Sequence, residues 1–370
     1  MRKLPVRWTS FVYDASGYAD ETRNMVLHLD QEKLQIKLIP AGHRSDTFGI
    51  LEEDTRQKLD RMVQEKDHPN PVNIVWLPAF YLTRNSEAVA NIVRTMFETD
   101  RIPAEWVKPC NHMDEIWVPS QFNVETFTQM GVSPEKLFVI HSGVDPDMYF
   151  PEVVPTNWEN KKGYNFLSVF EWHHRKGWDV LLDAYLTGFS KKDDVALVLK
   201  VNLSFTTIEK VQRQMYEHIT SRGFKIDNIP DIVLINQYYT SKEMAALYAA
   251  CDAFVLPSRG EGWGRPYMEA MAVGLPTIGT CWSGQTEFMN DDNSYLISID
   301  GLEHVSRGHV LPGHQWARPS FEHTMALMRQ VYENRAQACE KGSRARKEIV
   351  ESWSWKNAAE KVEQRLNQFL

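Results

Sequence analysis

The sequence predicts an α/β protein made of two Rossmann-like domains, and two observations carry this prediction. Short apolar segments alternate with helical patterns from residue 8 to 141, and the alternation restarts at 164. Between them, residues 142–163 hold three prolines and little periodicity, as a linker would. Strand–helix alternation of this kind requires parallel sheets covered by helices on both faces. The 370 residues also suffice for two domains of roughly 100–200 residues each.

The first predicted domain spans residues 1–150. Each of its strands is a short apolar run, followed by a helical pattern or a turn. Helices are expected from Gly17 to about Gln31, over 51–66, and after Ser120, which is a suitable N-cap residue. The strands are predicted at 8–13, 34–39, 72–77, 90–97, 115–119 and 136–141.

The second predicted domain spans residues 151–352 and repeats the pattern. Its strands are predicted at 164–170, 195–201, 231–236, 252–257, 276–280 and 294–298, and its helices at about 178–189, 207–221 and 241–250. The end of the chain looks helical. Ligands of parallel sheets bind outside the carboxyl ends of the strands, so the loops that directly follow strands are expected to carry the chemistry.

Composition and charge exclude several classes of protein. The net charge of −8 argues against a nucleic-acid binder that works by general attraction to phosphates. Cys110, Cys251, Cys281 and Cys339 lie far apart, without metal-ligand or redox spacing, and are predicted to be buried thiols in a reducing compartment. Neither a signal-peptide pattern nor an apolar run of membrane-span length is recognised, so a cytoplasmic protein is expected.

The stretch SRGEGWGRPYMEAMAVGLP, residues 258–276, directly follows a predicted strand. Its three alternating glycines allow a sharp turn and a close approach of the backbone to a ligand. Pro266 suits the first turn of a helix, and Gly274 suits its end. A glycine loop that leads into a helix start presents backbone N–H groups, which favour phosphate.

Two carboxylates, Glu261 and Glu269, stand in the same stretch with seven residues between them. Carboxylates suit the paired hydroxyls of a sugar or ribose, so a loop that also suits phosphate points to a nucleotide diphosphate sugar. In the alternative interpretation, Glu269 simply pairs with Arg265 on a solvated helix face. A dinucleotide site fits poorly, because GEGWGR lacks the last glycine of G-x-G-x-x-G.

The segment PSRGEGWGRPYMEAMAVGLPTIGT resembles the E-x7-E signature of the retaining family-4, or group 1, glycosyltransferases with the GT-B fold. In that fold two Rossmann-like domains face each other across a cleft. The resemblance covers most of residues 114–370, and it is weaker over 1–113, where the acceptor side would lie. It also implies that the terminal helix, 353–370, crosses back to the first domain. Further matching segments are 114–151, RKGWDVLLDAY, CWSGQTEF and WSWKNAAEKVEQRL.

The resemblance implies roles for individual residues. Glu261 would contact hydroxyls of the transferred sugar, Glu269 would bind the ribose, and Lys176 would bind the diphosphate. Gly17 would bring a first-domain loop to the same phosphates. The backbone donors would come from Gly262, Trp263, Gly264 and Arg265.

Two further residues are candidates for the donor side of the site. Glu287 occupies the glutamate position of the family's G-G-x-x-E turn, although it could instead serve as a helix-start charge. Gln237 follows a predicted strand and is a candidate for a contact with the base.

The chain departs from the family pattern at two positions. Phe170 stands where an arginine is usual, so Arg175 either replaces that cation or is only a neighbour of Lys176. Glu98 stands about where many relatives have a histidine. It would orient the acceptor or stabilise positive charge on the sugar, or else it has a structural role with Arg101.

No metal or other cofactor is expected. Asp145 and Asp147 imitate a D-x-D metal motif but fall in the linker. His304, His309 and His314 recur every five residues, a spacing that puts them on no common helix face, so a solvated loop is expected.

The function predicted from these residues and the resemblance is a metal-independent, retaining hexosyltransferase. It would move a sugar from a nucleotide diphosphate sugar to a hydroxyl of a glycan, a lipid-linked molecule or a small molecule. The acceptor would attack from the face that the diphosphate leaves. Peripheral contact with the inner membrane face is left open. The alternatives are a GT-B epimerase or phosphorylase, and a non-catalytic glycan-binding protein.

Overall fold

The computed structural model describes residues 3–46, 49–159, 161–204, 206–305 and 311–369. The chain divides into two compact units. Unit 1 comprises Met1–Asp145 with Ser352–Leu370, and unit 2 comprises Pro146–Glu351.

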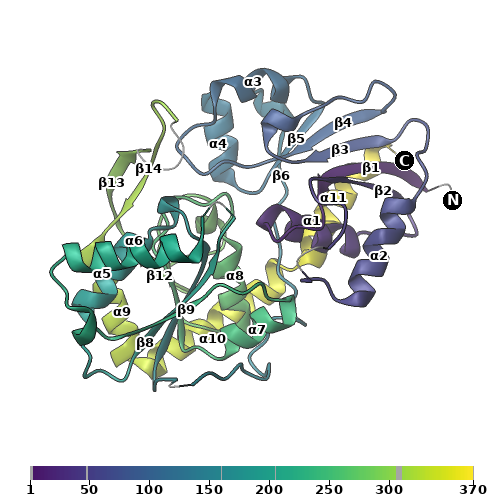
Figure 1. The fold of residues 1–370 in the computed structure, drawn as a ribbon. Helices are drawn as coiled ribbons and strands as arrows, with labels where there is room; N and C mark the ends of the chain where they lie inside the picture. The colour runs from purple at the N-terminus through teal and green to yellow at the C-terminus, as the bar shows by residue number, and fades with distance from the viewer. Residues whose placement is uncertain (1–2, 47–48, 160, 205, 306–310, 370) are drawn as a thin grey trace. The chain divides into compact units, whose positions relative to one another are not determined.

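Unit 1 contains a six-stranded parallel sheet in the order β2-β1-β3-β4-β5-β6 (Figure 1). The strands are β1 (Leu4–Phe11), β2 (Leu34–Ala41), β3 (Val72–Trp76), β4 (Ala90–Arg94), β5 (Glu115–Val118) and β6 (Leu137–Val139). Strand β1 begins four residues before its predicted start, because Leu4 is already in register with Leu34 of β2. The strand order reverses between β1 and β3, which is where ligands of such sheets bind.

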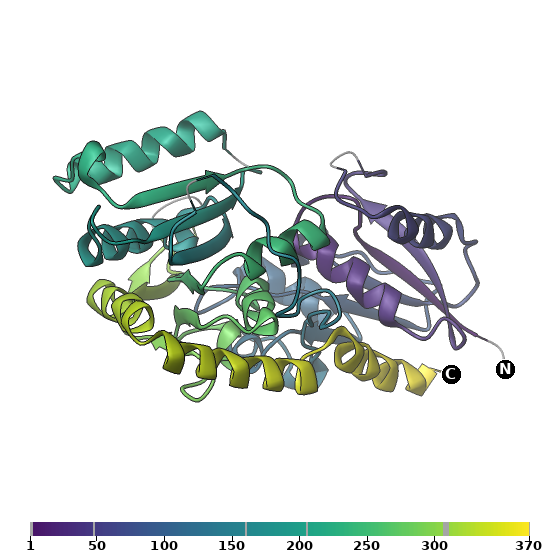
Figure 2. The same ribbon diagram turned by 90° about the horizontal axis from the view of Figure 1, so that it is seen from below.

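Helices cover this sheet. They are α1 (Gly17–His28), α2 (Glu53–Gln64), α3 (Ala104–Asn111), α4 (Gln121–Gln129) and α11 (Trp355–Leu366). The predicted N-cap of α4 is confirmed, since the side chain of Ser120 accepts a hydrogen bond from the backbone N–H of Asn123. Helix α11 packs against α1 (Figure 2), and its Trp355 and Val362 are buried in the same core as Trp8 of β1.

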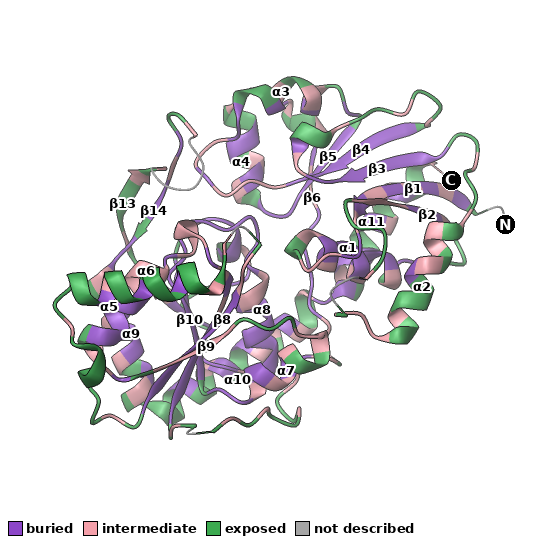
Figure 3. Cartoon of the chain, in the orientation of Figure 1, coloured by how far each residue is buried: buried purple, intermediate pink, exposed green. Residues whose placement is uncertain are grey.

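Unit 2 contains a second six-stranded parallel sheet, in the order β12-β11-β10-β7-β8-β9. The strands are β7 (Asn165–Glu171), β8 (Ala196–Asn202), β9 (Asp231–Ile235), β10 (Ala253–Leu256), β11 (Thr277–Thr280) and β12 (Tyr295–Ile297). Most of its strands are buried (Figure 3). The order reverses between β7 and β10, so the two loops that follow these strands flank the expected ligand position.

The helices of unit 2 agree with the predicted positions to within a few residues. They are α5 (Trp178–Gly188), α6 (Ile208–Ser221), α7 (Ser241–Ala249), α8 (Arg265–Val273), α9 (Phe321–Glu333) and α10 (Arg335–Ser352). Within the parts of the chain that the structure describes, no helix is long and apolar enough to cross a bilayer.

An antiparallel ribbon, β13 (Ile299–His304) with β14 (Gln315–Pro319), was not predicted. The expectation of a solvated loop is therefore wrong for His304, which is exposed but ends β13, and for His314, which is buried beside β14. His309 lies outside the described residues. The segment lacks a clear apolar alternation, which is why its strands escaped prediction.

The cysteine prediction is half wrong. All four cysteines are free, and Cys110 and Cys251 are buried as expected, but Cys281 and Cys339 are exposed. Cys281 directly follows β11, at the edge of the sheet, and Cys339 lies on the outer side of α10. Spacing alone does not reveal which side of an element a cysteine occupies.

Candidate functional site

The loops after β7 and β10 pack against each other at the carboxyl edge of the unit 2 sheet. Gly177 has φ of +67°, and a Cβ at this position would collide with the carbonyl oxygen of Pro257. The backbone N–H of Arg259 donates to the carbonyl of Arg175 at 2.6 Å. Glycine at 177 therefore allows the two loops to approach closely.

This packing brings three predicted site residues together. The ammonium of Lys176 donates to both carboxylate oxygens of Glu261, at 2.6 and 2.7 Å. Arg175 donates through Nη1 to the carbonyl of Gly260 at 2.6 Å, and the same atom lies 3.6 Å from Glu261 Oε2. The side chains of Lys176 and Glu261 are only 12% and 6% exposed, so this is a nearly buried ion pair.

Arg259 anchors the loop but was missed by the sequence analysis. Its guanidinium donates to both oxygens of Asp179 at 2.8 Å and to Glu303 Oε1 at 2.6 Å. Burial alone would raise the pKa of Asp179, but the hydrogen bonds and charge of Arg259 lower it. Arg259 thus connects the glycine loop to the first turn of α5 and to β13. Its sequence neighbours gave no signal for these distant partners.

The predicted start and end of α8 are confirmed. Gly264 is its N-cap with φ of +97°, Pro266 lies in the first turn, and Gly274 is its C-cap with φ of +87°. Both positive φ values favour glycine. Trp263 is buried directly before this helix start.

Glu269 is buried, with 8% of the residue exposed. It accepts hydrogen bonds from Arg265 Nη2 and from the hydroxyl of Tyr248, both at 2.9 Å. The Arg265–Glu269 pair that the alternative interpretation requires therefore exists, but Glu269 is buried and does not lie on a solvated helix face. Burial and the charge of Glu269 raise the pKa of Tyr248, which keeps this hydroxyl a donor.

A short 3-10 helix, η5 (Gly284–Glu287), fixes the backbone of Glu261. The N–H of Gly284 donates to the Glu261 carbonyl at 3.0 Å, and the Glu261 N–H donates to Ser283 Oγ at 2.9 Å. Ser283 has φ of +74° and ψ of −154°, a region that suits glycine. It occupies the first glycine position of the G-G-x-x-E turn, a departure that the sequence analysis overlooked.

The remaining donor-side residues lie around this centre. Glu287 is the last residue of η5 and is partly exposed, and Gln237 is exposed in the loop after β9. Phe170 is buried at the end of β7 and stacks on Trp172, with ring centroids 5.9 Å apart. The usual arginine position is therefore part of an aromatic cluster.

The candidate residues of unit 1 also lie at the carboxyl edge of their sheet. Gly17 is the first residue of α1, and Glu98 follows β4. Burial, and then the charge of Glu98, raise the pKa of Tyr18, which directly follows Gly17. Arg101 Nη2 lies 2.8 Å from the Asp100 carboxylate. That guanidinium is therefore engaged by its neighbour.

A buried ion pair in the core of unit 1 was not foreseen. Arg94 Nη2 donates to Glu21 Oε1 at 2.6 Å, and both side chains are almost completely buried. The hydroxyl of Ser142 donates to the same Glu21 oxygen. The pair connects the end of β4 to α1 and to the chain segment after β6.

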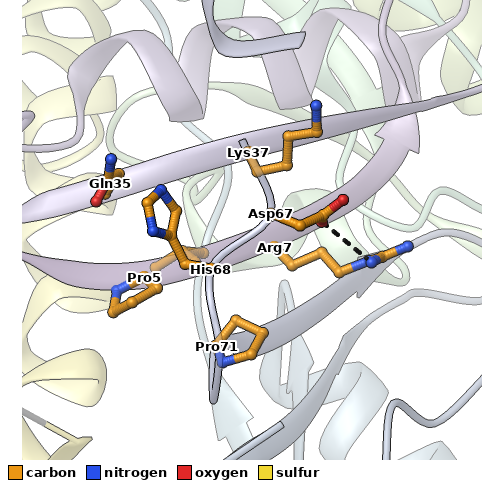
Figure 4. Close-up of a pocket in the computed structure, with 8 residues that line it drawn as sticks. Pro5, Arg7, Gln35, Lys37, Asp67, His68 and Pro71 are labelled. Carbon is orange, nitrogen blue, oxygen red and sulfur yellow. Dashed lines mark hydrogen bonds and ion pairs between the residues drawn. The ribbon is translucent and has the colours of Figure 1, made fainter. Parts of the chain in front are cut away.

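A small pocket in unit 1 lies at the opposite edge of the sheet (Figure 4). Its lining includes Pro5, Gln35 and Pro71, at or just before the amino ends of β1, β2 and β3, and Arg7 pairs there with Asp67 at 3.2 Å. Ligands of parallel sheets bind at the carboxyl ends, so we assign this pocket no role.

Among the residues whose positions are described, no three His, Cys, Asp or Glu side chains gather as a metal site would require. The metal independence expected from the sequence stays a prediction.

Comparisons with known proteins agree with this geometry. Residues 162–305 match the family model of group 1 glycosyl transferases. Mannosylfructose-phosphate synthase from Agrobacterium fabrum is 27% identical over 161 residues, which cover 42% of this chain and 34% of that protein. The MMP alpha-(1->4)-mannosyltransferase of Mycolicibacterium hassiacum is 23% identical over 64% of this chain and 49% of its own length. The chain thus spans a third to a half of these two relatives.

Solved structures match over nearly the whole chain. Sucrose-phosphate synthase from Thermosynechococcus elongatus has a TM-score of 0.74 at 14% identity, covering 99% of both chains. Anabaena HepE, solved in complex with UDP-glucose, has a TM-score of 0.66 at 12% identity, covering 99% of this chain and all of that one. These likenesses, together with the two parallel sheets, confirm the predicted GT-B fold class.

Proposed function

We propose that the protein transfers a sugar from a nucleotide diphosphate sugar to an acceptor hydroxyl, because residues 162–305 match the family model of group 1 glycosyl transferases. The observation that carries this proposal is the cluster of Arg175, Lys176 and Glu261. It lies between β7 and β10, where the strand order reverses, and beside the start of α8.

In this proposal each residue of the site has a different role in the transfer. Lys176, with Arg175 beside it, would stabilise the negative charge that grows on the departing diphosphate. Glu261 would orient hydroxyls of the sugar, and Glu269 would bind the ribose. Backbone N–H groups at the start of α8 would contact phosphate oxygens. The present Lys176–Glu261 contact means that donor binding must exchange part of an ion pair for contacts with the ligand.

We further propose that the transferred group is a hexose, that its anomeric configuration is retained, and that no metal takes part. The proposal of a hexose is supported by the names of the relatives, which include mannosyltransferases, and by the UDP-glucose complex of HepE. The leaving phosphate could itself take the proton of the acceptor, so no separate base is needed. The acceptor, the cytoplasmic location and any peripheral membrane contact stay predictions.

The test is a panel of nucleotide sugars, with thermal shift for binding and release of free nucleoside diphosphate for turnover. We expect stabilisation by at least one donor, about 2.7 kcal/mol at a hundredfold excess over Kd. Diphosphate release that requires an added acceptor, and that EDTA leaves intact, supports a metal-independent transferase.

The other outcomes decide between the remaining classes. Conversion of the donor sugar without an acceptor would indicate an epimerase, and phosphate-dependent cleavage of a glycan would indicate a phosphorylase. Failure of every nucleotide sugar and nucleoside diphosphate to bind would indicate a non-catalytic glycan-binding protein. The Glu261→Gln variant is the control, since it should lose turnover in each catalytic case.

A further inference from the structure

Lys200 is a buried lysine that the proposed mechanism does not use. It lies in β8, and only 3% of the residue is exposed. Its ammonium donates to Asn202 Oδ1 at 3.0 Å and lies 5.5 Å from the centroid of the Tyr239 ring. Within the described part of the chain, no carboxylate lies within ion-pair distance of it.

This arrangement costs stability. An ammonium needs several hydrogen-bond acceptors, and burial without an opposite charge disfavours its charged form. Burial accordingly lowers the pKa of Lys200 to about 8, so the group is still mostly charged at neutral pH. A buried cation without an anionic partner destabilises the fold, and groups with such shifted pKa values occur preferentially at functional sites.

Lys200 also lies at the edge of the sheet where a nucleotide would bind. It is in register with Val169 of β7 and with Ile235, the last residue of β9. The loop after β9 carries Tyr239. In Rossmann sheets with this strand order, phosphates bind after the first strand and a residue at the end of the second strand contacts the nucleoside. In unit 2 these two strands are β7 and β8.

A buried oxygen atom without a hydrogen bond lies on the same face as Lys200. Glu171, the last residue of β7, is in register with Asn202. Its Oε1 atom is buried, and none of the described residues gives it a hydrogen bond. Residues in register on neighbouring parallel strands point to the same face, as do residues two apart on one strand. On one face of this edge, an ammonium with a single hydrogen-bond acceptor among the described residues therefore accompanies a carboxylate oxygen with no donor.

We propose that Lys200 donates a hydrogen bond to a carbonyl oxygen of the donor's base, so that the protein selects a uracil or guanine nucleotide over an adenine nucleotide. This inference rests on the proposed function. Adenine has no carbonyl oxygen, whereas uracil and guanine carry a ring N–H next to a carbonyl. That N–H suits the unsatisfied oxygen of Glu171.

The experiment is a calorimetric titration of the full chain with UDP, GDP, CDP and ADP. We expect UDP or GDP to bind at least about tenfold more tightly than ADP, since a hydrogen bond to a charged group is strong when buried. Lys200→Met should weaken binding of the preferred nucleotide about tenfold to a hundredfold and leave ADP binding nearly unchanged. The matched control is Lys192→Met, which changes an exposed lysine of unit 2.

Thermal unfolding without nucleotide distinguishes base recognition from a structural role. If Lys200 stabilised the fold, replacing it would lower the melting temperature. Lys200→Met should melt at the same temperature as the wild type or higher, because it removes a buried charge. A variant that melts much lower, or does not fold, would assign Lys200 a structural role and overturn the proposal.

The remaining outcomes separate this inference from the proposed function. Equal binding of ADP and UDP by the wild type, or an equal loss for all nucleotides in Lys200→Met, would overturn base selection alone. If none of the four diphosphates binds the wild type, the proposed function fails and this inference fails with it.

Discussion

Lys176 and Glu261, which lie 85 positions apart in the chain, form a two-pronged ion pair, with the ammonium 2.6 and 2.7 Å from the two carboxylate oxygens. The cation proposed for the diphosphate is thus bound by the carboxylate proposed for the sugar. The two residues neutralise each other's charge. Changing one of them alters the stability of the protein as well as its chemistry.

The first prediction separates these two effects. Lys176→Ala should lower the free energy of unfolding by about 3–5 kcal/mol, because it leaves a nearly buried carboxylate without its main partner. The double variant Lys176→Met/Glu261→Gln should regain much of that loss, since neither charge remains. Urea unfolding measures both. Equal destabilisation of the two variants would contradict a stabilising role for the pair.

Turnover should not follow stability in these variants. Both proteins lack the cation, so kcat should fall by about a hundredfold or more in each, even where folding is restored. Initial rates are measured at a temperature where every variant is folded. Near-normal kcat in the double variant would remove Lys176 and Glu261 from the proposed machinery.

The second prediction concerns Arg175, whose Nη1 atom lies 3.6 Å from Glu261 Oε2. If Arg175 replaces the cation missing at Phe170, then Arg175→Ala should lower kcat about as much as Lys176→Met. The double variant Arg175→Ala/Lys176→Met should then lose less kcat than the two single losses combined, because both groups act on one diphosphate. Additive losses, with a mild effect of Arg175→Ala alone, would make Arg175 only a neighbour of Lys176.

Much of the fold could be predicted because buried parallel strands appear in a sequence as short apolar runs. The ends of α8 could be predicted too, since Gly264 and Gly274 have the positive φ values that glycine favours. Contacts between distant residues could not, and this explains why Arg259 with Asp179 and the Lys176–Glu261 pair were missed. Lys200, by contrast, does stand out in the sequence, because it is the one charged residue in the predicted strand VALVLKV.

The third prediction concerns Ser283, whose φ of +74° is unusual for a residue other than glycine. Ser283→Ala should lower the free energy of unfolding by about 1–3 kcal/mol, because the N–H of Glu261 loses its buried acceptor while the strain stays. Ser283→Gly loses the same bond but relieves about 1–3 kcal/mol of strain. Denaturant titration should therefore rank the glycine variant above the alanine variant. The reverse order would show that the conformation is not strained.

The fourth prediction tests the two interpretations of Glu98. If it orients the acceptor or stabilises positive charge on the sugar, Glu98→Gln should lower kcat by at least about tenfold and leave the Kd of the nucleotide unchanged. Glu105→Gln, an exposed change on α3, is the control. Full activity together with reduced stability would return Glu98 to a structural role in unit 1.

The last prediction concerns His141, which is buried in unit 1 with its ring against Trp353. Its Nδ1 lies 2.8 Å from the carbonyl of Ser142. Burial lowers the pKa of His141 to about 4, and the positive charges of Lys361 and Arg94 act in the same direction. The folded protein therefore keeps this ring neutral at a pH where an unfolded chain would protonate it.

The sign of the pH dependence follows from that lowered pKa. Between about pH 6.5 and pH 4 the unfolded state binds the extra proton, so stability falls as the pH falls, by at most ~1.36 kcal/mol per pH unit and about 3 kcal/mol in total. His141→Gln should remove this part of the slope, while the exposed His112→Gln should keep it. Urea unfolding at pH 7, 6, 5 and 4.5 measures the slopes. If all three proteins lost stability in parallel, His141 would not be the group that titrates.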